Sequence, residues 1–252
     1  MSVSWNPWHG CHKYSEGCLN CYVYRIDERY DKISSEITKN SSFDLPIRRG
    51  RGGNGYKIPS GETVYTCFSS DFLIEEADAW RDQAWSMMRE RQDLSFIFIT
   101  KRITRLHELL PLDWGDGYDN VSIGCTCENQ RRADERLPAF LTLPIKHRFV
   151  ICEPLLEPID LSRYLCDKID FVSVGGESGK NARVCNYDWI LGIRDACIMA
   201  NVSFVFRQTG TRFQKDGKLY YIERKNHFSQ AKRAAIDHTA SKDILEYPGD
   251  EP

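Results

Sequence analysis

Short apolar runs alternate with amphipathic stretches along most of this chain of 252 residues. The runs that we expect to form strands are residues 63–68, 95–100, 121–125, 148–152, 171–174 and 203–206, with a first strand near 3–6. The stretches that we expect to form helices are residues 74–91, 103–110, 129–143, 161–166 and 187–200. Strands that are apolar throughout and separated by helices indicate a parallel sheet that is covered on both faces.

The number of these strand–helix units favours an α/β fold built as a complete or partial TIM-type (β/α) barrel with parallel strands. An open doubly wound sheet is the alternative. We expect residues 1–210 to form the barrel, with a cysteine-rich loop near its start. Residues 211–252 are expected to form an extension, with a hairpin turn at 215–218 and a basic helix near 228–236.

The composition limits the possible partners and compartments. A formal net charge of −2 gives no overall attraction to nucleic acid, so any basic surface must be local. Residues 47–59 and 225–233 are the basic stretches, and each is either a nucleic-acid contact or a solvated segment. No apolar run is long enough to cross a membrane and no leader pattern is present, so we expect a cytoplasmic protein without membrane contact. Ten cysteines without an export signal then indicate reduced thiols or metal ligands.

The N-terminal region carries three closely spaced cysteines, Cys11, Cys18 and Cys21. Three thiolates leave one metal position unfilled, and an iron–sulfur cluster with three protein ligands has one iron free to bind something else. Gly10 and Gly17 would let backbone N–H groups face the sulfurs. The alternatives are a structural zinc site with His9 or His12 as the fourth ligand, or three unrelated buried thiols.

Polar residues follow the expected strands at the edge where a barrel gathers its functional groups. The candidate residues at these strand ends are Ser70, Asp71, Thr126, Glu128, Glu153, Gly176 and Glu177. Three glutamates, Glu128, Glu153 and Glu177, occupy the same position just after a strand. This recurrence is unusual for polar residues that only mark where the chain emerges from the core. The cations and amides near them, Lys101, Arg102, Arg207 and Gln208, would bind a substrate anion or pair with these glutamates.

The run Trp-Asn-Pro-Trp-x-Gly-Cys-x6-Cys-x2-Cys-Tyr, which begins at Trp5, resembles the cluster loop of the radical S-adenosylmethionine (SAM) superfamily. The usual spacing in that superfamily is Cys-x3-Cys-x2-Cys, so the first interval is longer here. The chain is similar to a phage-associated, radical-SAM-like family of unassigned function. The further segments that carry this resemblance are Ser-Asp-Phe at 70–72, Thr-Lys-Arg at 100–102, Asn-Val-Ser-Ile-Gly at 120–124, Glu-Asn-Gln at 128–130, Glu-Pro-Leu-Leu at 153–156 and Gly-Gly-Glu-Ser-Gly at 175–179.

The resemblance implies a [4Fe–4S] cluster on the three cysteines, with SAM bound at the free iron. Reductive cleavage of SAM would yield a 5′-deoxyadenosyl radical that removes hydrogen from the substrate, with a donor such as flavodoxin or ferredoxin supplying the electron. By the same resemblance, Ser70 and Asp71 would hold the SAM amino group, although Asp71 is also a candidate cap for the following helix.

Other cofactor contacts implied by the resemblance are Thr126, Glu128 and Glu153 for hydroxyl groups, and the turn at Gly176 and Glu177 for close backbone approach. The first expectation for the substrate is a nucleotide or a nucleic-acid base. The alternative function is a non-catalytic zinc- or Fe–S-binding module.

Four further cysteines lie in or next to the expected strands, Cys67, Cys125, Cys127 and Cys152. They would hold a second cluster, donate a hydrogen atom to a substrate radical, or pack as small apolar side chains.

Overall fold

The computed structural model describes residues 2–50, 52 and 55–241, and its main feature is one parallel sheet of seven strands. The strands are β1 (Ser2–Trp5), β4 (Thr63–Thr66), β5 (Ser95–Thr100), β6 (Val121–Thr126), β7 (His147–Cys152), β8 (Phe171–Gly175) and β10 (Ser203–Gln208). Their order across the sheet follows their order along the chain, and every neighbouring pair is parallel. A doubly wound sheet reverses its strand order at one point, so that alternative is wrong.

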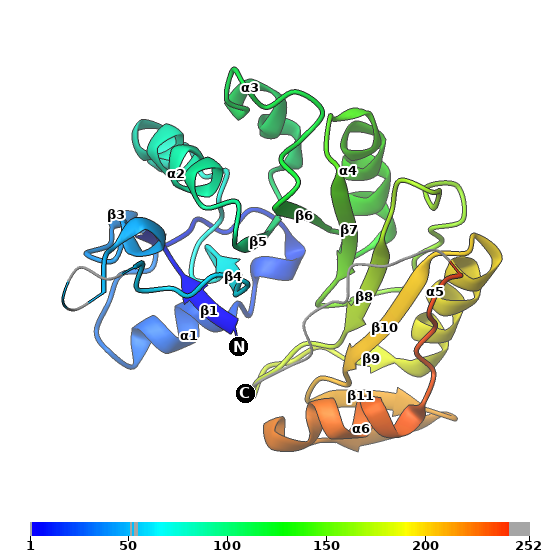
Figure 1. The fold of residues 1–252 in the computed structure, drawn as a ribbon. Helices are drawn as coiled ribbons and strands as arrows, with labels where there is room; N and C mark the ends of the chain where they lie inside the picture. Colours follow the sequence, from blue (N-terminus) through cyan, green and yellow to red (C-terminus); the bar gives the residue numbers. More distant parts are fainter. Residues whose placement is uncertain (1, 51, 53–54, 242–252) are drawn as a thin grey trace.

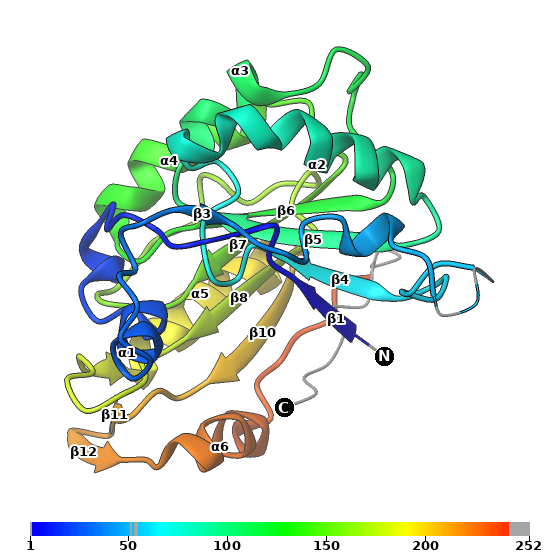
Figure 2. The ribbon, with the colours of Figure 1, turned by 90° about the vertical axis from the view of Figure 1, so that its left-hand side faces the viewer.

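The sheet curls into an open half-barrel (Figures 1 and 2). Its two edges are β1 and β10, which are not paired with each other in the described residues. The α/β class with parallel strands is therefore confirmed, in the form of a curled half-barrel.

Four helices cover the outer face of the half-barrel (Figure 1). They are α2 (Asp78–Glu90), α3 (Leu106–Leu109), α4 (Gln130–Thr142) and α5 (Tyr187–Met199). Strand residues alternate between two apolar clusters: Phe96 and Phe98 of β5 belong to the large core, whereas Ile97 packs with Phe149 and Phe171 in a small second cluster. This two-sided burial explains why the strands are apolar throughout.

The expected helices differ from the observed ones mainly at their ends. Short 3₁₀ turns precede two of them, η3 (Glu75–Ala77) before α2 and η4 (Ile103–Arg105) before α3. The helix expected at 161–166 is wrong, since that segment forms only a turn in which Tyr164 and Leu165 donate to the carbonyl of Leu161. The hydrogen bonds here close separate turns, since Ser162 donates its N–H to the carboxylate of Asp160 at 2.9 Å and Ile169 donates to the carbonyl of Cys166 at 3.0 Å.

The connection between β1 and β4 carries the cysteine loop. It contains β2 (Trp8–His9), which pairs with β3 (Thr38–Lys39), and the helical segments η1 (Glu16–Cys18), α1 (Tyr22–Glu28) and η2 (Leu45–Ile47). Trp5 and Trp8 are buried in the core and anchor the start of the loop. None of the helices in the described part of the chain is long and apolar enough to span a bilayer.

The extension after β10 adds a helix and two strands, and these strands form a second small sheet with a strand that precedes α5. The sheet contains β9 (Cys185–Asn186), β11 (Arg212–Lys215) and β12 (Lys218–Tyr221), and η5 (Arg224–Asn226) leads into α6 (His227–Ala234). The expected hairpin and basic helix are thus confirmed. Asp216 and Gly217 both have positive φ, 51° and 71°, as a two-residue type I′ hairpin requires. Arg51 of the basic stretch 47–59 and residues 242–252 lie outside the described residues.

Candidate metal centre

Cys11 is held between two distant segments of the chain. Its N–H donates to the carbonyl of Ser34 at 2.7 Å, and the N–H of Gly10 donates to the carbonyl of Ser69 at 3.3 Å. Gly10 has a φ of +94°, and a Cβ at this position would lie 2.5 Å from the carbonyl oxygen of Glu36. Only glycine fits there without displacing the backbone.

Cys18 and Cys21 lie on consecutive tight turns. The N–H of Cys18 donates to the carbonyl of Ser15 at 2.9 Å, and the N–H of Cys21 donates to the carbonyl of Cys18 at 3.3 Å. Cys21 is the N-cap of α1. Burial raises the pKa of the Cys21 thiol, while hydrogen bonds from the backbone N–H groups of Val23 and Tyr24 act to lower it.

The glycine amides do not face the sulfurs, contrary to the expectation from the sequence. The N–H of Gly10 is directed at Ser69, and the N–H of Gly17 donates to Oε1 of Glu128 at 3.2 Å. Gly17 is needed for space instead, since a Cβ there would lie 3.0 Å from that carboxylate oxygen. The amides that do reach a sulfur come from the start of α1.

The three thiols share one electrostatic environment. Burial raises the pKa of Cys11 to about 12, Asp71 adds to this rise, and Arg102 opposes it from 3.8 Å between Nη1 and the sulfur. Cys18 also acts to raise the pKa of both Cys11 and Cys21. Thiols lose their protons when a metal cation binds them.

Glu128, which follows β6, supports the cysteine loop through hydrogen bonds. Its Oε1 accepts hydrogen bonds from the hydroxyl of Ser15 and the N–H of Gly17, and its Oε2 lies 2.7 Å from Nη1 of Arg136. Both charged side chains of this pair are fully buried. Burial alone would raise the pKa of Glu128, but Lys101 and Arg136 outweigh it and lower the pKa.

Glu177 at the end of β8 holds the same loop at a second point. It accepts a hydrogen bond from Nδ2 of Asn20, which lies between Cys18 and Cys21, and another from Nε of Arg183, both at 3.0 Å. Arg183 also donates to the carbonyl of Glu16 at 2.9 Å. Burial acts to raise the pKa of Glu177, and Arg183 and Asn20 lower it overall.

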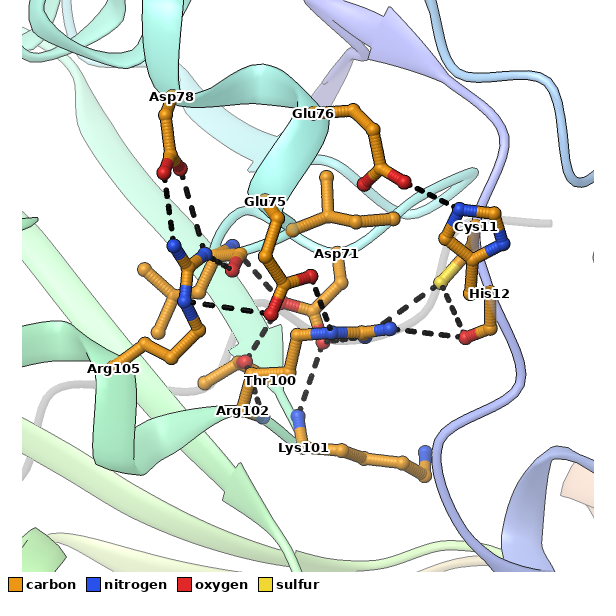
Figure 3. A network of polar contacts seen from close by, with 12 residues as sticks. Cys11, His12, Asp71, Glu75, Glu76, Asp78, Thr100, Lys101, Arg102 and Arg105 are labelled. Carbon is orange, nitrogen blue, oxygen red and sulfur yellow. Dashed lines mark hydrogen bonds and ion pairs between the residues drawn. The ribbon is translucent and has the colours of Figure 1, made fainter.

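Asp71 and Arg102 form the third support, beside Cys11 (Figure 3). Asp71 is buried and accepts hydrogen bonds from the hydroxyl of Thr100 at 2.7 Å and from Nη1 of Arg102 at 3.2 Å. Arg102 in turn donates to the carbonyl of His12 at 3.0 Å. Arg102 therefore pairs with acids, as expected of at least one strand-end cation. Its partners are Asp71 and, at 3.9 Å from its Nε, Glu75, and not the glutamates at the strand ends.

The alternative role of Asp71 as the cap of the next helix is wrong. Helix α2 begins at Asp78 with Ala77 as its N-cap, because the 3₁₀ turn η3 intervenes. Asp71 instead accepts the N–H of Leu73 at 2.9 Å in a local turn. Its neighbour Ser70 donates its hydroxyl proton to the carbonyl of Gly10, so this residue also supports the loop.

Glu153 and Thr126 stand apart from these supports. Glu153 at the end of β7 accepts hydrogen bonds from the neutral groups of Ser173, at 2.7 Å, and Gln208, at 3.2 Å. Thr126 is buried at the end of β6, where its carbonyl accepts from Arg136 at 2.6 Å. No contact between either residue and the cysteine loop is seen in the described part of the chain.

Gly176 allows two strand ends to approach each other. A Cβ at this position would lie 2.2 Å from the carbonyl oxygen of Thr209, which follows β10. The N–H of Gly176 donates to the carbonyl of Gln208 at 3.0 Å. The close approach that the sequence suggested thus involves the protein's own backbone.

The described residues include no group of three or more His, Cys, Asp or Glu side chains arranged to hold a single metal ion. The two histidines of the zinc alternative are engaged by carboxylates. Nε2 of His9 lies 2.9 Å from Asp27, and Nε2 of His12 contacts Glu76. A zinc site needs four ligands that converge on one ion, whereas the thiolates of a cluster bind separate irons.

A cavity of about 480 Å³ opens beside Cys21. It is bordered by the cysteine loop, by α1 and by the residues after β8. Lys13, Arg25 and Lys32 line it together with a single acid, Glu28. The surroundings of the cysteine loop on this side are therefore positively charged.

The remaining strand cysteines, Cys67, Cys125, Cys127 and Cys152, are fully buried in the apolar core. Burial raises the pKa of Cys67, Cys127 and Cys152 well above that of a free thiol. This environment favours the packing alternative for these residues.

The sequence analysis missed the residues that connect the loop to the strand ends, Ser15, Asn20, Arg136 and Arg183. One signal was present for Arg136, which lies on the apolar side of the amphipathic helix α4 with Ala133 and Phe140. A cation at such a position needs a buried anion. The partners Ser15 and Asn20 carry no comparable signal, because polar residues are ordinary in a loop.

A family model described as "Protein of unknown function (DUF5131)" matches residues 1–243. The match spans the cysteine loop, the half-barrel and the extension. No curated protein and no solved structure matches the chain.

Proposed function

We propose that this chain, which belongs to the DUF5131 family, is a radical-SAM-type enzyme with a [4Fe–4S] cluster on Cys11, Cys18 and Cys21. One observation carries the proposal. Three thiols share one loop at the carboxyl end of a curled parallel sheet, and buried charged side chains from three strand ends hold that loop in place. Active sites of α/β barrels lie at this end.

The donor set fits the cluster. Thiolates are the ligands that iron–sulfur clusters take, and a set of three leaves one iron for a further ligand. Arg102 approaches the sulfur of Cys11 to 3.8 Å, and hydrogen bonds to sulfur tune the potential of such clusters. The histidines needed for a closed zinc site are hydrogen-bonded to carboxylates.

When bound, the cluster and SAM supply the one-electron cleavage that generates a 5′-deoxyadenosyl radical for hydrogen abstraction. The protein's own residues divide the remaining work. Glu128, Glu177 and Asp71 position the cysteine loop, the latter through Arg102, and Ser70 supports it through Gly10. We assign cofactor hydroxyl contacts to Thr126 and Glu153, because Glu153 is engaged by neutral donors and a carboxylate accepts several hydrogen bonds.

The proposal retains the other expectations from the resemblance. The half-barrel is taken as a partial TIM-type barrel, the electron donor as a flavodoxin or ferredoxin, and the compartment as the cytoplasm. The substrate class is a nucleotide or a nucleic-acid base.

Anaerobic reconstitution with iron and sulfide tests the function. We expect a brown protein that binds iron and labile sulfide, whose dithionite-reduced electron paramagnetic resonance signal changes on addition of SAM. Cys18→Ala should abolish the signal. Cys166→Ala is the matched control, since it removes a partly exposed thiol outside the loop and should leave the signal intact.

Two results would contradict the proposal. A colourless protein that takes up stoichiometric zinc through Cys18 would identify the loop as a structural zinc site. A reduced cluster that neither responds to SAM nor forms 5′-deoxyadenosine would identify an electron-transfer module.

A further inference from the structure

The extension after the half-barrel is basic, although the chain as a whole is not. Residues 211–241 contain seven lysines and arginines against three carboxylates, while the formal net charge of the chain is −2. The views in Figures 1 and 2 place α6 and the β11–β12 hairpin at one end of the molecule, away from α2 and α3. This end of the molecule therefore carries an excess of positive charge.

A cavity of about 260 Å³ lies between this extension, β10 and the start of α5, and it has aromatic walls. Tyr187, Phe206, Phe213 and Tyr220 line it. The rings of Phe206 and Phe213 are stacked, with centroids 6.0 Å apart, and are largely buried. Tyr220 is 40% exposed, far more than either phenylalanine. The walls thus offer flat apolar surfaces to a planar ring.

Charged side chains surround the same cavity. Lys215 and Arg233 both line it, and among residues 2–50, 52 and 55–241 neither of them forms an ion pair. Nζ of Lys215 lies 4.6 Å from the centre of the Tyr187 ring. Gln230 adds an amide that donates and accepts hydrogen bonds. Aromatic walls with cations and an amide at the edge match the chemistry of a nucleotide, which joins a planar base to a phosphate.

We propose that this cavity binds an unpaired base of a single-stranded nucleic acid, with Tyr220 stacking on the base and Lys215 and Arg233 contacting the adjacent phosphates. Bases in a duplex are stacked on each other and cannot enter such a cavity, so the single strand is the preferred form. The role of this binding, which is to deliver a substrate, rests on the proposed function. The binding itself needs no cluster.

The cavity lies next to the supports of the cysteine loop. Thr209 lines it, and the backbone of this residue is the one that approaches Gly176. The N–H of Thr211 donates to the carbonyl of Glu177 at 2.9 Å, and Glu177 holds Asn20 of the loop. A strand anchored in the cavity would therefore start beside the carboxyl edge of the half-barrel.

Fluorescence anisotropy with short labelled oligonucleotides of mixed sequence tests the inference on the purified full chain, without cluster reconstitution. We expect single-stranded DNA or RNA to bind more tightly than duplex DNA, and binding to weaken as salt rises. Separate DNA and RNA arms identify the sugar. Tyr220→Ala should weaken binding about tenfold, which is the size of one lost base–aromatic stack.

The neighbouring residue provides the matched control. Tyr221 is 73% exposed on the other face of β12 and does not line the cavity, so Tyr221→Ala should bind as the unmodified protein does. Lys215→Ala should weaken binding and reduce the salt slope by about one, whereas Lys168→Ala, which removes an equal charge before β8, should not.

Several outcomes would overturn the inference. These are equal affinity for duplex and single strand, equal effects of Lys215→Ala and Lys168→Ala, or equal affinity for polyglutamate, which would indicate an acidic protein partner. Loss of binding in Tyr221→Ala but not in Tyr220→Ala would place the contact on the wrong face. Failure of cluster assembly would not change the oligonucleotide-binding measurements. The proposed function and this inference can therefore be contradicted independently of each other.

Discussion

At the scale of single residues, the position of the cysteine loop depends on buried charged side chains that contact it. Glu128 and Arg136 are fully buried as a pair, and Glu128 also accepts the N–H of Gly17. A buried ion pair of this kind adds little stability compared with an apolar pair, but removing one partner leaves the other charge buried and unpaired. The pair therefore favours one specific position of the cysteine loop.

Glu128→Gln should lower the free energy of unfolding by about 3 kcal/mol at neutral pH, because Arg136 loses its charged partner. Chemical denaturation measures this change. The control is Glu135→Gln on α4, the helix that carries Arg136, because Glu135 is exposed and its partner Arg132 keeps Glu16 as a second acid. An exposed pair contributes little, so the control should unfold within about 0.5 kcal/mol of the unmodified protein.

The difference in the free energy of unfolding between the unmodified protein and Glu128→Gln should depend on pH. The pKa of Glu128 is lowered in the folded protein from the ordinary value of 4.5, so its ionised form stabilises the fold above that value. This contribution is lost as the pH falls through the folded pKa. The gap between the unmodified protein and Glu128→Gln should therefore shrink below about pH 4.5. A gap that grows on acidification would contradict the assignment.

At the scale of elements, the last described segment protects one edge of the sheet. Phe204 and His238 exchange backbone hydrogen bonds across an isolated antiparallel bridge, and the carboxylate of Asp237 accepts the N–H of Phe206 at 2.8 Å. An edge strand with free N–H groups invites pairing with another chain. The segment thus takes the place that a further barrel strand would occupy beside β10.

Asp237→Ala should lower the free energy of unfolding by roughly 1–3 kcal/mol, since the N–H of Phe206 loses its acceptor. It should also increase light scattering on mild heating. Asp195→Ala on α5 is the control, because Asp195 is an exposed residue paired with its neighbour Arg194. Equal scattering from both variants would show that the segment does not protect the edge.

At the scale of the whole molecule, the half-barrel and the extension share one core. Phe213 of β11 and Ala231 of α6 belong to the same apolar cluster as the strands, and β11 pairs with β9, which lies before α5. The two regions proposed from the sequence therefore meet through buried apolar contacts. Shared burial predicts that they unfold together.

Phe213→Ala should destabilise the whole chain by about 3 kcal/mol, the usual effect of removing a buried ring. All six tryptophans precede residue 190, and five of them precede residue 115, so their fluorescence reports mainly on the half-barrel. We expect the fluorescence and far-ultraviolet circular dichroism transitions of the variant to shift together. A fluorescence midpoint that does not move would show that the extension unfolds independently.

Local spacing in the chain was enough to place most strands and helices, the hairpin and the cysteine loop. Apolar period, turn residues and intervals between cysteines act over a few positions, so they can be read along the chain. The exceptions are also local: residues 161–166 have a helical composition but form only turns, and Asp71 is a good cap next to a helix that starts later.

The connections between distant segments were decided by the fold. Glu128 meets Ser15 across 113 positions, and Glu177 meets Asn20 across 157. Which cation neutralises a buried acid depends on how strand ends and helix faces are brought together, and sequence distance carries no information about that. Likewise, the alternation of strands and helices left the barrel and the doubly wound sheet both open. Hydrogen bonding between particular strands, in the same order as the chain, chose between them.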